Sequence, residues 1–272
     1  MTAAAPVLFT AIISGSILIA TGLRTQPGQV AGASPPGLHL IVIGDSIPYG
    51  QGDCGYCTPF IELFGRALSR ATGRRVSVAN WADHTGIDSA DLLHHLKDVS
   101  TLRQAVKRAD GIVVTIGHND PPWNNEHDPC DGNRTAPDVD WTKYDTACVA
   151  ATAKVYRANL RGILRAVRAL RQGKTTLVRV TDDYNDITGD PSLPRSAGSR
   201  AKLWYDTYSA ITCKVAHAYG AMCIDTYHAF NGADGTQDAG RLLASDHTHP
   251  NAQGHQLIAR LLIRAGFRPI YP

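Results

Sequence analysis

Short runs of β-branched and other apolar residues alternate with longer amphipathic segments along most of this 272-residue chain. Strands that alternate with helices form βαβ units, and such units build parallel sheets. The pattern therefore predicts an α/β fold, doubly wound, with a mainly parallel five-stranded sheet. We expect strands at 38–43, 76–79, 111–116, 176–180 and 221–225. We expect helices at 60–71, 90–108, 144–170, 201–219 and 252–265.

The first residues have the composition of an export segment. Residues 3–20 are apolar or small, and Ala31-Gly32-Ala33 matches a signal-peptide cleavage site. No Lys or Arg precedes Arg24, although a signal peptide normally begins with positive charge. Two interpretations follow. Residues 1–33 are a cleaved signal peptide and the protein is secreted, or residues 3–20 remain as an anchor on the outer side of a membrane. We expect residues 34–272 to form one domain.

Charge and cysteine content narrow the class of protein. The formal net charge of +3, without a basic stripe, argues against nucleic-acid binding. Six cysteines are unusual for a reduced cytosolic protein and favour an oxidising compartment. They allow 15 pairings, and we expect sequence neighbours to pair: Cys54–Cys57, Cys130–Cys148 and Cys213–Cys223. A redox function for Cys54-Gly55-Tyr56-Cys57 is the alternative reading of the first pair.

A serine and a histidine stand where catalysis is expected in a parallel sheet, beyond the carboxyl ends of the strands. Ser46 follows the first strand in Gly44-Asp45-Ser46. A serine nucleophile needs a base, and the base needs a carboxylate on its other ring nitrogen. Residues 246–250, Asp-His-Thr-His-Pro, supply both. We favour His249 as base because a proline fixes it, with His247 as rival. The alternative is a plain turn at Ser46, with Asp246 capping the next helix.

Two further residues are candidates for an oxyanion hole. Asn119 lies in Gly117-His118-Asn119-Asp120 after the third strand, where its amide could donate to a developing negative charge. An Asx turn is the simpler explanation of that residue. Gly86 follows the second strand, and its backbone N–H could approach the same charge.

The blocks around Ser46, Gly86, Asn119 and His249 follow one another in the order found in SGNH (GDSL-type) hydrolases, and the chain resembles this family over most of residues 38–265. The resemblance implies a three-layer, flavodoxin-like α/β/α sandwich. It implies Ser46 as nucleophile, His249 as base and Asp246 as its orienting acid. The oxyanion hole would consist of Gly86, Asn119 and the Ser46 backbone N–H. The block at residues 80–86 departs from the family because it lacks the usual run of small residues.

We therefore expect a secreted serine esterase or lipase that acts through an acyl-enzyme on a small-molecule or lipid ester. We expect a monomer, with peripheral lipid contact as an option, and no cofactor or metal, since His94, His95 and His255 lack partners at metal-ligand spacing. An acyltransferase, a carbohydrate O-acyl esterase and a catalytically silent binding protein are the alternatives. Residues 121–142, which include the sequon at Asn133, and residues 182–185 either shape the pocket or form ordinary surface loops.

Overall fold

The structure is a computed structural model that describes residues 36–49, 54, 57–124, 128–132 and 139–272. In this part of the chain, one five-stranded sheet has the order β2-β1-β3-β4-β5, and all neighbouring strands are parallel. The predicted α/β class and parallel five-stranded sheet are confirmed. The strands are β1 (Leu38–Gly44), β2 (Val76–Ala82), β3 (Gly111–Thr115), β4 (Leu177–Thr181) and β5 (Met222–Ile224).

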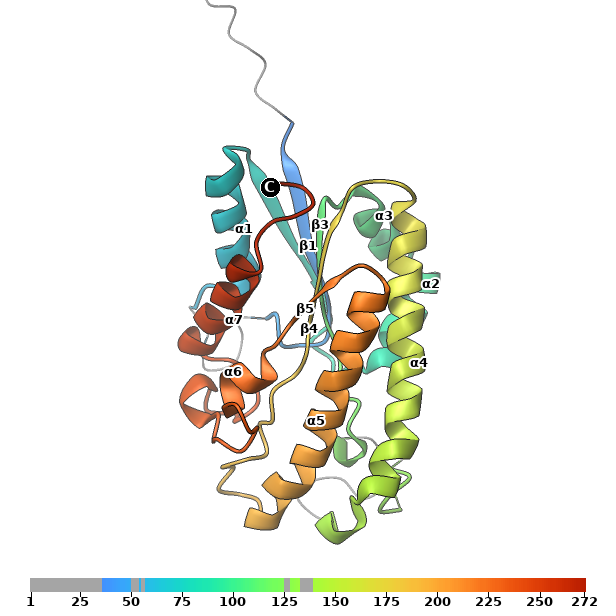
Figure 1. Cartoon of the computed structure of the whole chain (residues 1–272), viewed down its shortest axis with the longest axis vertical. Helices are drawn as coiled ribbons and strands as arrows, with labels where there is room; N and C mark the ends of the chain where they lie inside the picture. Colours follow the sequence, from blue (N-terminus) through green and yellow to red (C-terminus); the bar gives the residue numbers. More distant parts are fainter. Residues whose placement is uncertain (1–35, 50–53, 55–56, 125–127, 133–138) are drawn as a thin grey trace, which may run out of the picture. The chain divides into compact units, whose positions relative to one another are not determined.

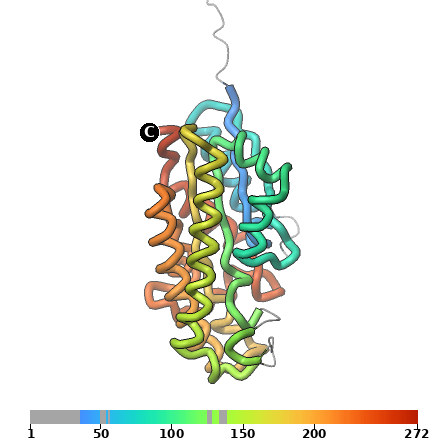
Figure 2. The backbone as a smooth tube through the Cα atoms, turned by 90° about the vertical axis from the view of Figure 1, so that its right-hand side faces the viewer, coloured from blue at the N-terminus to red at the C-terminus, as the bar shows by residue number. Residues whose placement is uncertain are grey.

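Helices cover both faces of the sheet, so the predicted three-layer arrangement is confirmed (Figure 1). On one face, α1 packs against α7; on the other, α4 packs against α2 and α5. The two long helices α4 and α5 lie side by side (Figure 2). The helices are α1 (Phe60–Thr72), α2 (Ser89–Asp98), α3 (Ser100–Arg108), α4 (Thr146–Arg171), α5 (Arg195–Ala218), α6 (Tyr227–Asn231) and α7 (Ala252–Arg264).

Each face of the sheet has its own apolar core because alternate strand residues point to opposite sides. Ile41 and Ile43 of β1 contribute to the core under α2–α5, whereas Leu40 and Val42 contribute to the core under α1 and α7. The second core also contains Ile47, which directly follows Ser46. The chain is therefore fixed by packing at the point where β1 ends and the predicted nucleophile begins.

The structure differs from the sequence prediction in three helices. The segment predicted as one helix at 90–108 is two helices, because Val99 is extended (φ −84°, ψ 102°) and Arg103 donates to the carbonyl oxygens at the end of α2. Helix α5 starts at Arg195, directly after Pro194, rather than at 201. The short helix α6 was not predicted. Apolar periodicity does not locate the exact ends of helices, and a helix of five residues is too short to show it.

Three neighbouring strands end in register at one edge of the sheet. Gly44 at the end of β1 pairs with Thr115 of β3, and Thr115 pairs with Thr181 of β4. The residues that follow these strands therefore emerge side by side, and the candidate site is built there.

Candidate active site

Ser46 lies on a turn that is anchored to the sheet. A Cβ at Gly44 (φ 139°) would lie 1.6 Å from the carbonyl oxygen of Thr115, so this position requires glycine. The N–H of Asp45 donates to the same carbonyl oxygen at 3.0 Å, and the N–H of Tyr49 donates to the Ser46 carbonyl oxygen at 2.9 Å. Only 9% of the Ser46 surface is exposed. The position of this hydroxyl is thus set by backbone contacts.

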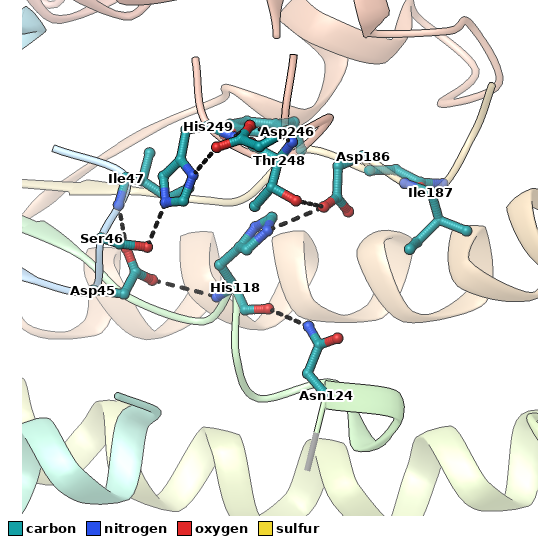
Figure 3. Close-up of polar contacts among 12 residues, drawn as sticks. Asp45, Ser46, Ile47, His118, Asn124, Asp186, Ile187, Asp246, Thr248 and His249 are labelled. Carbon is teal, nitrogen blue, oxygen red and sulfur yellow. Dashed lines mark hydrogen bonds and ion pairs between the residues drawn. The ribbon is translucent and has the colours of Figure 1, made fainter. Parts of the chain in front are cut away.

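The loop of residues 243–250 brings His249 to Ser46. Its ends, Leu243 and Pro250, form an antiparallel bridge. The His249 Nε2 lies 2.8 Å from the Ser46 Oγ, and its Nδ1 lies 2.7 Å from the Asp246 Oδ2 (Figure 3). The three side chains therefore form one hydrogen-bonded series from hydroxyl to imidazole to carboxylate. Such a series lets the imidazole take the proton from the hydroxyl.

Hydrogen bonds keep Asp246 ionised. Burial by itself raises the pKa of this carboxyl, but the backbone N–H groups of His249 and Thr248 and the His249 side chain hold the pKa below its usual range. The two N–H groups donate to the Asp246 Oδ1 at 2.9 and 3.0 Å. A carboxylate beside the His249 Nδ1 favours the tautomer with hydrogen on that atom, so the Nε2 lone pair faces Ser46.

The rival base, His247, is exposed and has a positive φ of 58°. Within the described residues, His249 and not His247 is hydrogen-bonded to Ser46. The choice between the two histidines made from the sequence therefore agrees with the geometry.

Asn119 and Gly86 lie near each other along the edge of the sheet. The Asn119 Nδ2 donates to the carbonyl oxygen of Ile87, next to Gly86, at 2.9 Å. An amide nitrogen has two hydrogens, so the second remains for a ligand. Gly86 has a φ of 85°, is exposed, and has open space where a Cβ would stand. Its conformation favours glycine, while its environment leaves the backbone accessible.

Sequence reasoning missed a second histidine–aspartate pair beside the first. The buried His118 has its Nε2 3.2 Å from the Oδ2 of Asp186, a residue of the segment that follows β4. Burial by itself lowers the pKa of His118, but the charge and hydrogen bond of Asp186, with the charges of Asp183 and Asp45, raise it to about 9. These carboxylates therefore favour the protonated form of His118. The signal in the sequence is the histidine of residues 117–120, which directly precedes Asn119.

Other acids around His118 titrate far from their ordinary range. Burial raises the pKa of Asp45 to about 6, although the charge of His118 and N–H groups donating to Asp45 oppose the rise. Burial also raises the pKa of Asp183 well above its ordinary value, and the charge of Asp45 adds to this effect. Asp120 accepts hydrogen bonds from the N–H and hydroxyl of Ser89, and burial raises its pKa to about 8.

A pocket of about 670 Å³ lies beside the site. Asn119 and Thr248 belong to its wall and connect it to the residues described above. None of its lining residues is Lys or Arg. The lining residues are His118, Asn119, Trp123, Asn124, Asp186, Ile187, Asp190, Ser192, Leu193 and Thr248. Trp123 comes from the 121–142 segment, as one of the two interpretations predicted. Residues 182–185 do not line the pocket, and Asp182 instead accepts hydrogen bonds at the start of α6.

All six cysteines are in disulfides, and the pairs are the predicted ones: Cys54–Cys57, Cys130–Cys148 and Cys213–Cys223. Two groups of side chains in the described residues have ligand atoms close enough to hold a metal ion. Both groups consist of one disulfide and one further residue, His255 or Asp182. Disulfide sulfurs are not thiolates, so neither group offers the anionic sulfur ligands that zinc sites use.

Two predictions lie outside the described residues: the export segment or anchor at 1–33 and the sequon at Asn133. In the ranges that the structure describes, no helix combines the length and apolarity needed to cross a membrane.

Comparison with known proteins adds independent information. The model of the GDSL-like lipase/acylhydrolase family matches residues 42–257. The fold is similar to a lipase from a goat rumen metagenome (TM-score 0.67, 21% identity, 86% of this chain and 99% of that chain). It is also similar to an acetylxylan esterase from Geobacillus stearothermophilus (TM-score 0.55, 22% identity, 85% and 95%). A search of curated proteins found no match.

Proposed function

The chain belongs to the GDSL-like lipase/acylhydrolase family and is a carboxylic ester hydrolase, and we propose that it works through Ser46, His249 and Asp246. The observation that carries this proposal is the hydrogen-bonded series: 2.8 Å from Ser46 to His249 and 2.7 Å from His249 to Asp246. A hydroxyl, an imidazole and a carboxylate in this order are the groups that nucleophilic acyl transfer requires.

In the first half-reaction, the Ser46 Oγ attacks the ester carbonyl carbon while the His249 Nε2 takes the hydroxyl proton. The Asp246 carboxylate stabilises the imidazolium that forms. The negative charge on the carbonyl oxygen is met by the free N–H of the Asn119 amide and by the backbone N–H groups of Gly86 and Ser46. The tetrahedral intermediate then expels the alcohol, which receives its proton from His249, and the acyl group remains on Ser46.

In the second half-reaction, His249 takes a proton from water, and the resulting hydroxide attacks the acyl-enzyme. The bond between the acyl carbon and the Ser46 Oγ then breaks, the acid leaves, and His249 returns its proton to the Oγ, which restores the Ser46 hydroxyl. A fluorophosphonate probe tests this path, because it should attach to Ser46 and abolish hydrolysis of p-nitrophenyl acetate. Ser46→Ala should prevent both labelling and turnover. Full esterase activity in Ser46→Ala would contradict the proposal.

A second candidate function is removal of small acyl groups from carbohydrates. The supporting observation is the pocket beside Asn119, whose wall includes the carboxylates of Asp186 and Asp190 and the hydroxyls of Ser192 and Thr248. Such a wall can accept hydrogen bonds from sugar hydroxyls, and it lacks the basic residues that would favour an anionic head group. The similar structure of an acetylxylan esterase agrees with this reading.

A substrate series distinguishes the two functions. A lipase should favour longer acyl chains among p-nitrophenyl esters, and a carbohydrate esterase should prefer acetate and release acetate from acetylated xylo-oligosaccharides. Adding an acceptor alcohol to the same assays separates hydrolysis from acyl transfer, since transfer yields a new ester in place of free acid.

We propose that the protein is secreted and monomeric. The three disulfides support an oxidising compartment. The mass of the protein recovered outside expressing cells tests cleavage after Ala33, whereas recovery with the membrane fraction would support an anchor at residues 3–20. Light scattering on the purified protein tests the monomer.

A further inference from the structure

We propose that Asp186 is a positioning residue for the loop of residues 243–250 and that His118 is the counter-ion that holds Asp186 in place. The inference rests on the catalytic roles proposed above for Ser46, His249 and Asp246. It adds a second histidine–aspartate pair whose task is to fix the distance between the base and the oxyanion donor.

The loop needs external support because part of its backbone is strained. His247 has a φ of 58°, a region that residues with a Cβ rarely occupy. Thr248, the next residue, lies between Asp246 and His249. Its N–H donates to the Asp246 Oδ1 at 3.0 Å, and its carbonyl oxygen accepts from the Tyr184 hydroxyl at 2.6 Å. Any displacement of Thr248 therefore moves the side chains on both sides of it.

Asp186 holds Thr248 by its side chain. The Thr248 Oγ1 donates to the Asp186 Oδ2 at 3.3 Å, and the His118 Nε2 lies 3.2 Å from the same oxygen (Figure 3). The other oxygen, Oδ1, accepts from the Tyr205 hydroxyl of α5 at 3.0 Å. A carboxylate with three donors is fixed in both position and plane.

The contacts of Asp186 with Thr248 and His118, called the Asp186 bridge below, join two parts of the proposed active site that come from different elements. Thr248 precedes His249, and His118 precedes Asn119, so Asp186 connects the neighbour of the base to the neighbour of the oxyanion donor. Catalysis by aligned groups is sensitive to shifts of about 1 Å, which can change rates by about a hundredfold. The Asp186 bridge lies where it can control this alignment.

Asp186 is only 10% exposed, and the His118 Nε2 lies 3.2 Å from its Oδ2. The charged groups that face His118 are Asp45, from the turn after β1, and Asp183 and Asp186, from the segment after β4. Of these, Asp186 is hydrogen-bonded to the ring through its side chain. Asp186 is therefore the carboxylate that directly compensates a proton on the buried His118 ring.

Two substitutions test the contact between Asp186 and Thr248, one at each residue. Asp186→Asn removes the charge, and Thr248→Val removes the hydroxyl but keeps the shape of the side chain. For p-nitrophenyl acetate, we expect each to lower kcat about tenfold or more with little change in KM, and to slow labelling of Ser46 by a fluorophosphonate to the same degree. The double variant should be no slower than Asp186→Asn, because residues that act through one contact are not additive.

Asp98→Asn is the matched control. It breaks an exposed histidine–aspartate pair of α2, in which the His94 Nδ1 lies 2.9 Å from the Asp98 Oδ2, and it should leave kcat and labelling unchanged. Thr248→Val also decides the matter if Asp186→Asn fails to fold, since the valine variant keeps the buried ion pair.

The outcomes separate the two proposals. Losses of kcat that multiply in the double variant, or unchanged kcat and labelling in Thr248→Val, would overturn the positioning role. The proposed function would survive either of these results, provided that Ser46→Ala lacks activity. Full activity of Ser46→Ala would instead remove the proposed function itself, whatever the other variants do.

Discussion

The His249 Nε2 lies 2.8 Å from the Ser46 Oγ, although 203 residues separate the two side chains along the sequence. The contact forms because β1 ends in a turn fixed to β3, while the loop of residues 243–250 closes on itself just before α7. Backbone structure thus holds both Ser46 and His249. Substitutions at and around this contact should therefore have measurable effects on kcat and on stability.

His249→Ala should lower kcat for p-nitrophenyl acetate by about 10⁴-fold or more, because the Ser46 hydroxyl loses its base. His247→Asn is the control. Asn tolerates the positive φ at this position, so it should keep kcat within about threefold of the natural chain. Steady-state kinetics on both variants, with circular dichroism to check folding, decide between the histidines. The reverse ranking would assign the base to His247.

Asn119→Ala should lower kcat about a hundredfold or more with little change in KM, because an oxyanion donor acts in the transition state. The variant also leaves the Ile87 carbonyl oxygen without its donor, so its thermal unfolding should be measured in parallel. A kcat equal to that of the natural chain in a folded variant would remove Asn119 from the oxyanion hole.

Asp120→Asn should stabilise the protein at alkaline pH. Burial raises the pKa of Asp120 to about 8, so the folded state holds a proton that the unfolded state releases near pH 4. Stability from this group is therefore lost as pH rises between these values. The amide mimics the protonated acid and does not titrate. Because the side chain is only partly buried, we expect a gain of about 1–3 kcal/mol at pH 8 that vanishes near pH 4.

Urea unfolding of both proteins at several pH values measures this difference. Ser89→Ala offers a comparison that removes the hydroxyl bonded to Asp120 and leaves the titrating acid in place. A gain in the Asp120→Asn variant that is constant across pH would show that Asp120 does not titrate in this range.

His118 should produce a loss of stability and activity at high pH. Its pKa is raised from 6.5 to about 9 by Asp186, Asp183 and Asp45 against the opposing effect of burial. The stability it contributes is full below about pH 6.5 and is lost as pH rises through about 9. Burial raises the pKa values of Tyr184 and Tyr205 well above 10, so these neighbours do not titrate there.

His118→Gln keeps a donor for Asp186 but has no titrating proton. The pH profile of kcat should therefore lack the step near pH 9 in this variant. A step that persists with the same midpoint would assign it to another group.

Removal of the Cys130–Cys148 disulfide should lower the free energy of unfolding. The bond closes a loop with a sequence separation of 18, for which about 2–4 kcal/mol of stabilisation is typical. The double Cys→Ser variant should show the loss in thermal unfolding, while kcat at 25 °C stays close to the natural value. Equal free energies of unfolding for the two proteins would show that this disulfide does not stabilise the folded state.

The sequence predicted the centre of the sheet well because β1, β3 and β4 are almost wholly buried and rich in apolar residues. It also identified Ser46, Asp246 and His249 for the candidate site, since these residues lie in short local motifs. The break at Val99 and the start of α5 at Arg195 were missed, because apolar periodicity does not locate the exact ends of helices. Asp186 was missed for a different reason: its partners, His118 and Thr248, come from distant segments.

The placement of Ser46 after the first strand and of His249 near the last helix also affects how the protein is made. A ribosome completes the strand that presents the hydroxyl long before it reaches the base. The hydroxyl of a growing chain has no proton acceptor until translation passes residue 249 and the last loop folds. Under the proposed mechanism, a nascent chain that has not reached residue 249 therefore carries the nucleophile without its base and cannot catalyse hydrolysis.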